Sequence, residues 1–130
     1  MMPHCRKYSA RALAVALYIA LLAASSVAQN GIELTGKEAF EKRCAGCHAL
    51  DADKVGPRLR GVYGRTAGRV KSFKYSDAVR NAHVTWDSTS LDKWLSDTET
   101  IIADNDMPFR MSNSEERAAI IEYLRSLSAK

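Results

Sequence analysis

A loop of about 25 residues, from Ala49 to Phe73, occupies the middle of this chain and shows little hydrophobic periodicity. A Gly-Pro pair at Gly56 and three further glycines interrupt it, as is typical of irregular structure. Such a stretch is uncommon inside a compact domain, because backbone polar groups without partners are costly to bury. A chain of this kind therefore needs something large and apolar at its centre in place of side chains.

Helical patterns lie on both sides of this loop. The capping-box pattern from Thr35 to Glu38 predicts a helix that ends near Cys44 and carries Phe40 on its apolar face. Ser76 is placed to cap a short helix over residues 77–82. A further helix is expected to begin near Ser88 or Thr89. It has three apolar side chains on one side: Leu91, Trp94 and Leu95.

The clearest helical pattern lies near the C-terminus. Residues Ser112 to Glu115 form a second capping-box pattern. Apolar residues follow it at helical spacing: Ala119, Ile120, Tyr123, Leu124 and Leu127. No stretch alternates convincingly enough for a β-sheet, and no internal repeat is present. We therefore predict an all-α fold.

The pentapeptide Cys44-Ala45-Gly46-Cys47-His48 is a C-x-x-C-H motif, which is the signature of covalent haem attachment. Two thiols at this spacing can add to the two vinyl groups on one edge of a porphyrin. The imidazole of His48 then reaches the iron from one face, and the small Ala45 and Gly46 let the backbone pass close to the ring. Such a haem would supply the apolar centre that the long loop needs. We predict one covalently bound haem c, held by Cys44, Cys47 and His48.

Three other uses of the paired cysteines remain open from the residues alone. A structural zinc site needs four nitrogen or sulfur ligands, and the chain has no second Cys or His pair. A redox-active C-x-x-C is expected after a strand in a βαβ unit, whereas this motif follows a predicted helix. A structural disulfide beside an unrelated histidine is the third alternative.

A haem iron has a sixth position, and its occupant separates an electron carrier from a catalyst. Met107 lies midway along the connection between two predicted helices, so its side chain can reach the far face of a haem. Met111 directly precedes Ser112 and is expected to pack against the protein, and His83 lies in a polar turn and is expected to be exposed. We predict His48 and Met107 as the two metal ligands.

The first 28 residues have the pattern of a secretory signal peptide. A basic start precedes the 13 apolar residues from Ala12 to Ala24, and the small residues Ser26 and Ala28 mark a cleavage site. The apolar run is shorter than the roughly 20 residues that span a bilayer, although an uncleaved anchor is the alternative. We expect cleavage after Ala28, one mature domain over residues 29–130 and a periplasmic location.

Loss of this segment changes the charge balance and the cysteine count. The full chain has 19 Lys and Arg against 15 Asp and Glu, and three of the basic residues lie in the signal peptide. The mature chain thus has a net charge of about +1, which gives no argument for nucleic-acid binding. Cys5 also leaves with the signal peptide, so Cys44 and Cys47 are the cysteines that remain.

Several ordered motifs beyond C-x-x-C-H resemble the class I c-type cytochromes, in the branch of mitochondrial cytochrome c and its bacterial periplasmic relatives. Gly36 and Phe40 match the N-terminal helix of that family, and Ile120 and Tyr123 match the C-terminal helix that crosses it. The segment VGPRLRGVYGRTAG, residues 55–68, resembles the loop after the attachment site. The resemblance covers about residues 36–129. It implies the cytochrome c fold, with crossing terminal helices and shorter helices and long loops around one haem.

The resemblance also implies roles for single residues. The carbonyl of Pro57 would accept a hydrogen bond from the second ring nitrogen of His48 and so orient the ring. Three residues fall where the family places donors to a buried haem propionate: Arg65, Tyr75 and Trp86. Met107 matches the axial methionine, and Phe109 matches its aromatic neighbour.

The chain departs from the family pattern around this methionine. Trp94 stands where a tyrosine is common, so a hydroxyl is missing from the pocket. The usual Pro-Gly-Thr-Lys approach to the ligand is replaced here by residues Ala103 to Asp106, and the join between Met107 and the last helix is one residue shorter. These differences bear on the rigidity of the loop and on the surface that a partner meets.

These observations predict an electron carrier and not an enzyme: a periplasmic protein that shuttles single electrons through a His/Met-ligated haem c. Its partners would be redox proteins, namely a periplasmic dehydrogenase, a bc1-type complex or a terminal oxidase, and no nucleic acid. We expect a monomer that is soluble after signal cleavage. Two alternatives stay open: a cytochrome subunit held in a dehydrogenase or oxidase complex, and a haem protein with an exchangeable sixth ligand.

Charge placement suggests the kind of partner. Mitochondrial-type relatives surround the exposed haem edge with lysines. Here the methionine side of that edge would carry acidic residues: Glu99, Asp104 and Asp106. Basic residues gather instead on the attachment side: Arg43, Lys54, Arg58 and Arg60. We therefore expect weak electrostatic steering toward an acidic docking face.

Overall fold

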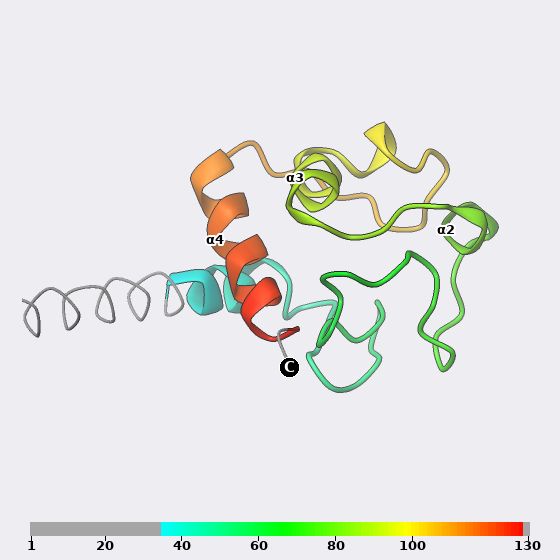
Figure 1. Cartoon of the computed structure of the whole chain (residues 1–130), viewed down its shortest axis with the longest axis horizontal. Coiled ribbons are helices and arrows are strands. Elements are labelled where there is room, and N and C mark those ends of the chain that lie inside the picture. The colour runs from blue at the N-terminus through cyan, green and yellow to red at the C-terminus, as the bar shows by residue number, and fades with distance from the viewer. Residues whose placement is uncertain (1–34, 129–130) are drawn as a thin grey trace, which may run out of the picture. The chain divides into compact units, whose positions relative to one another are not determined.

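The computed structural model describes residues 35–128, so the predicted signal peptide over residues 1–28 lies outside the described residues. An N-terminal helix over residues 35–43 comes first, followed after the long loop by α2 (Asp77–Asn81) and α3 (Ser88–Ser96). A 3-10 turn, η1 (Thr98–Thr100), and the C-terminal helix α4 (Ser114–Ser126) complete the order (Figure 1). Within residues 35–128 the β structure is one isolated antiparallel bridge, between Thr66 and Thr85. The predicted all-α class is confirmed.

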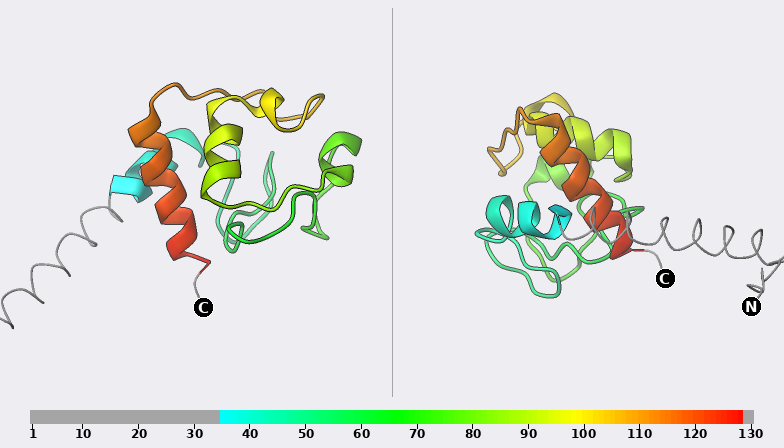
Figure 2. Two further views of the ribbon diagram at one scale, coloured as in Figure 1. Left: turned by 45° about the horizontal axis from the view of Figure 1, so that its top comes forward. Right: turned by 90° about the vertical axis from the view of Figure 1, so that its left-hand side faces the viewer.

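The N-terminal helix crosses α4, as the cyan and orange-to-red ribbons of Figures 1 and 2 show. The crossing is closest at Gly36, where an added Cβ would lie 2.3 Å from the carbonyl oxygen of Ala119 and 2.8 Å from the Cβ of Tyr123. One turn further on, the rings of Phe40 and Tyr123 pack with their centroids 5.6 Å apart. The two terminal helices therefore touch backbone to backbone, and only glycine fits at the contact.

Helices α2 and α3 begin close to where the sequence pattern placed them. The hydroxyl of Ser76 accepts a hydrogen bond from the backbone of Val79, as predicted, although α2 ends at Asn81, one residue earlier than expected. Helix α3 begins at Ser88, and its cap is Asp87, which exchanges side-chain and backbone hydrogen bonds with Ser90.

The predicted start of the last helix was wrong by one residue. Its cap is Asn113, whose side chain accepts from the N–H of Glu116, and Ser112 lies outside the helix. Asparagine caps a helix as well as serine does. The backbone N–H of Met111 donates to the carbonyl of Leu95 at 2.9 Å, which holds the chain outside the helix until Asn113.

The long loop satisfies its backbone groups by lying against other irregular segments. Residues 64–67 exchange hydrogen bonds with residues 84–86, among them Gly64 N to Trp86 O at 2.6 Å and Trp86 N to Arg65 O at 3.0 Å. Leu59 and Arg60 donate to the carbonyls of residues 49 and 50. The loop is thus ordered without forming a sheet, as predicted.

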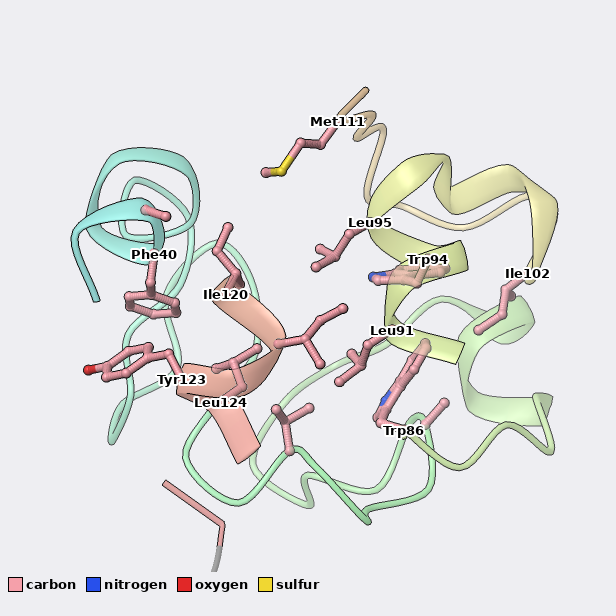
Figure 3. Packing of buried hydrophobic residues seen from close by; sticks show 14 residues of the cluster. Phe40, Trp86, Leu91, Trp94, Leu95, Ile102, Met111, Ile120, Tyr123 and Leu124 are labelled. Atoms are coloured by element: carbon pink, nitrogen blue, oxygen red, sulfur yellow. The ribbon is translucent and has the colours of Figure 1, made fainter. Parts of the chain in front are cut away.

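A hydrophobic core joins the N-terminal helix, α3, α4 and the loop (Figure 3). Ile120 is fully buried at its centre, and the indole rings of Trp86 and Trp94 pack with centroids 5.3 Å apart. Figure 3 also shows the side chain of Met111 directed into the space between the N-terminal helix and α3. Its burial agrees with the packing role expected for Met111.

Candidate haem site

The C-x-x-C-H motif forms a tight turn at the end of the N-terminal helix. Cys44 N donates to the carbonyl of Phe40 at 2.8 Å, and His48 N donates to the carbonyl of Cys44 at 2.8 Å. These bonds continue the helical hydrogen-bonding pattern just far enough to bring both cysteines and the histidine onto one turn. Both thiols are free, with Cys44 half-buried and Cys47 exposed. The motif therefore offers two thiols and one imidazole on a single rigid segment.

The alternative uses of this motif receive no support. Burial raises the pKa of the Cys44 thiol to about 11, whereas redox-active cysteines have a lowered pKa and react as thiolates. No disulfide joins Cys44 to Cys47. In the part of the chain that the structure describes, no three His, Cys, Asp or Glu side chains gather as a metal site would require.

The imidazole of His48 is oriented by the loop that follows it. The ring is buried, at 7% exposure, and its Nδ1 lies 2.7 Å from the carbonyl oxygen of Pro57. Because a carbonyl can only accept, Nδ1 carries the proton and donates, which leaves the lone pair on Nε2 for a metal. Burial lowers the pKa of His48, so the ring is held in the neutral form that coordinates iron. The bond to Pro57 that the resemblance implied is confirmed.

Gly56 is a site residue that sequence analysis assigned only to loop structure. A Cβ added there would lie 2.2 Å from Cε1 and 2.6 Å from Nδ1 of His48, so the glycine lies flat against the ring. Gly56 N donates to the carbonyl of Cys47 at 2.8 Å, which ties the loop to the attachment turn. The signal in the sequence was the Gly-Pro pair a few residues after the motif. The spacing of this pair from the motif does not show that the glycine lies against the ring of His48.

Arg65 interacts with both of the other residues expected near a haem propionate, Tyr75 and Trp86. The guanidinium of half-buried Arg65 donates to the carbonyls of Arg58 and Arg60, and within residues 35–128 it forms no ion pair with a carboxylate. Burial lowers its pKa, and the neighbouring phenol of Tyr75 interacts with it electrostatically. The backbone of Arg65 also bonds to that of Trp86. A half-buried cation with no carboxylate partner is suited to an anionic group of a cofactor.

Met107 lies on the connection between α3 and α4, apart from the attachment turn in the sequence. Its side chain is partly buried and packs against the core. Its backbone is held on both sides, because Asn105 Oδ1 accepts from its N–H at 2.9 Å and the hydroxyl of Thr98 donates to its carbonyl at 2.7 Å. His83 is exposed, as expected.

These residues fit a covalent haem: two free thiols and a neutral imidazole on one turn, a partly buried thioether, and a guanidinium that has no carboxylate partner among the described residues. Comparison with known proteins agrees. The model of the family described as Cytochrome c matches residues 34–128. Cytochrome c2 iso-2 of Magnetospirillum molischianum is 45% identical over 87 residues, which are 65% of this chain and 90% of that protein. Cytochrome c 2.1 of Caenorhabditis elegans is 40% identical over 98 residues, 73% of this chain and 88% of the relative.

A solved structure is also similar to this chain. Cytochrome cH from Methylobacterium extorquens superposes with a TM-score of 0.68 and 34% sequence identity, covering 72% of this chain and 96% of that one. The fold and the site thus define a c-type haem protein. The chain belongs to the cytochrome c family, binds one covalent haem c and carries electrons.

Proposed function

We propose that this chain is an exported single-electron carrier whose haem is attached through Cys44 and Cys47 and ligated by His48 and Met107. The observation that supports this most directly is the imidazole of His48, held by the Pro57 carbonyl at Nδ1 with Nε2 left for the iron. When bound, the haem supplies a one-electron Fe(II)/Fe(III) couple.

The protein's own groups favour fast electron exchange and a high potential. A fixed imidazole on one side and a thioether on the other would keep the ligand set the same in both redox states, so little has to move. The hydrogen bond from His48 to Pro57 raises the basicity of the ring and fixes its orientation. A thioether ligand and an apolar pocket both disfavour the extra positive charge of Fe(III) and so raise the potential. The buried indoles of Trp86 and Trp94 contribute to such surroundings.

The choice of Met107 as the sixth ligand can be tested by two matched variants. Met107→Ala should abolish the weak absorbance at the red edge of the spectrum that reports sulfur bound to Fe(III), lower the potential and admit carbon monoxide to the reduced protein. Met111→Ala should change none of these, although it removes a buried side chain and lowers stability. If the two variants exchange these results, Met111 is the ligand.

The periplasmic location and the domain boundary rest on the first 28 residues. In residues 35–128, no helix has the length and apolar character to cross a membrane. We infer that the chain is exported and cut after Ala28, which leaves a domain of residues 29–130. Mass analysis of the N-terminus in the periplasmic fraction should find Gln29 first. Retention of residues 12–24 would indicate a membrane anchor instead.

The partners are redox proteins, and the charge pattern supports a partner with a mixed or partly basic docking face. Two of the four basic residues on the attachment side form ion pairs, Arg43 with Glu116 and Arg60 with Asp51. The positive field expected on that side is therefore weaker than the sequence suggested. With a mature net charge of about +1, the protein lacks the single-sign field that steers association most strongly.

A further inference from the structure

The side chain of Asn105 makes three hydrogen bonds within the loop that carries Met107. Its Nδ2 donates to Glu99 Oε1 at 2.7 Å and to the carbonyl of Ile102 at 2.8 Å. Its Oδ1 accepts from the N–H of Met107 at 2.9 Å. We call this set of three bonds the Asn105 clamp. It connects the first turn of the loop directly to the backbone of the methionine.

The clamp admits only one orientation of the amide. Nδ2 faces a carboxylate and a carbonyl, which can only accept, and Oδ1 faces an N–H, which can only donate. Rotating the amide of Asn105 by half a turn would break all three bonds. An aspartate at this position would set two acceptors against the carboxylate of Glu99.

Glu99 secures the same loop with its other oxygen. Oε2 accepts from the N–H of Asp104 at 3.1 Å, and Asp104 has a φ of 58°, in the left-handed region. This bond fixes the tight turn that leads into Asn105. A hydrogen bond to a carboxylate is stronger than one between neutral groups, even where the side chains are partly exposed.

The backbone carbonyl of Met107 is also held by a side chain. The hydroxyl of Thr98, which is 1% exposed, donates to the carbonyl of Met107 at 2.7 Å. Side chains therefore bind both the N–H and the carbonyl of this residue. Together these bonds restrict the positions that the backbone of Met107, and with it the thioether, can take.

We propose that Asn105 and Glu99 are positioning residues that hold Met107 in place as the sixth iron ligand. The inference rests on the proposed function, in which Met107 is that ligand. The clamp acts through the backbone of Met107, and it reduces the frequency with which the thioether leaves its position.

The test measures how often the thioether of Met107 leaves the iron in the oxidised, haem-loaded protein. At saturating imidazole, the rate at which imidazole replaces the methionine is limited by the opening of the loop. Asn105→Ala should raise this limiting rate at least about tenfold, since it removes all three hydrogen bonds of the clamp. Glu99→Ala should raise it less, because the bonds of Asn105 to Ile102 and Met107 remain. The double variant should exceed Asn105→Ala by less than the separate effect of Glu99→Ala, since one of the two bonds of Glu99 is made with Asn105.

Asp106→Asn is the matched control. Asp106 lies between Asn105 and Met107, is exposed, and its side chain makes no hydrogen bond or ion pair in the described part of the chain. Its substitution should leave the limiting rate unchanged. An Asn105→Ala rate equal to that of Asp106→Asn would overturn the proposal. So would a faster opening that is matched by an equal fall in global stability, since the role would then be structural only.

Failure of the ligand assignment gives a different result. If Met107→Ala retains the sulfur-to-iron absorbance, Met107 is not the ligand, and the clamp cannot position it. If Met107→Ala loses that absorbance while Asn105→Ala opens no faster than the wild type, the proposed function stands and the clamp proposal fails.

Discussion

The guanidinium of Arg43 binds the carboxylate of Glu116 through two parallel hydrogen bonds, Nε to Oε1 at 2.8 Å and Nη2 to Oε2 at 2.9 Å. Arg43 is the last residue of the N-terminal helix and directly precedes Cys44, and Glu116 lies in the first turn of α4. The attachment turn is therefore tied to the C-terminal helix by the strongest geometry that an arginine and a carboxylate can adopt.

This ion pair should make stability depend on pH in the acid range. The hydrogen bond from Arg43 lowers the pKa of Glu116 below its usual value, so the pair stabilises the fold above the unfolded-state pKa of about 4.3. The stabilisation is lost as the pH falls through the folded-state pKa. Urea unfolding of the holoprotein from pH 7 to pH 3 should show a smaller loss of stability for Glu116→Gln than for the wild type. Glu115→Gln, in the same helical turn, should keep the wild-type pH dependence.

Gly36→Ala should separate the terminal helices. The new Cβ would lie 2.3 Å from the carbonyl oxygen of Ala119, and backbone cannot yield as a flexible side chain can. We expect a loss of about 1–3 kcal/mol, despite the better helix propensity of alanine. Thermal unfolding of the holoprotein measures this loss of stability. Lys42→Ala, at an exposed position of the same helix, should stay within about 0.5 kcal/mol of the wild type. Equal midpoints for the two variants would contradict the close crossing.

Gly56→Ala should displace the ring of His48, because its Cβ would overlap Cε1 at 2.2 Å. We expect little holoprotein on expression and, in what forms, a loss of stability of at least about 1–3 kcal/mol. Pro57→Ala is the control, since it keeps the carbonyl that accepts from His48 and should cost less than about 1 kcal/mol. Normal haem content in Gly56→Ala would show that the ring can move aside freely.

Electron transfer to a mitochondrial oxidase should be slow and depend weakly on salt. Asp106→Lys should speed this reaction several-fold at low salt, because it replaces a negative charge on the methionine side by a positive one. Asp104 is less suitable for this test, because its φ of 58° disfavours a long side chain. Glu38→Lys makes the same change of charge on the N-terminal helix and should have a smaller effect. A fast wild-type rate that collapses with salt would show that the acidic loop does not govern docking.

Much of the fold could be predicted from local patterns. The capping residue Ser76, the apolar face of α3 and the spacing of Ile120, Tyr123 and Leu124 are properties of short segments, and the structure confirms each of them. The attachment motif is equally local, because helical bonds from Phe40 and Cys44 suffice to bring its three side chains onto one turn.

The errors and omissions concern contacts between distant segments. The start of α4 was misplaced because its true register has Asn113 as the cap, with Glu116 free to bind Arg43, 73 residues earlier. Gly56 was assigned only to the loop, since nothing in its sequence neighbourhood shows that the ring of His48 lies against it. Neither the contact of Arg43 with Glu116 nor that of Gly56 with His48 produces a periodic pattern in the sequence.

The sequence by itself thus determined the helices, the loop between them and the chemistry of the haem attachment, because each depends on residues within a few positions of one another. Only the tertiary structure decided how tightly the terminal helices cross at Gly36, which atom of His48 is left for the iron and how Asn105 holds Met107. Steric fit and hydrogen-bond direction set these three relationships, and both depend on atoms that only the folded chain brings together.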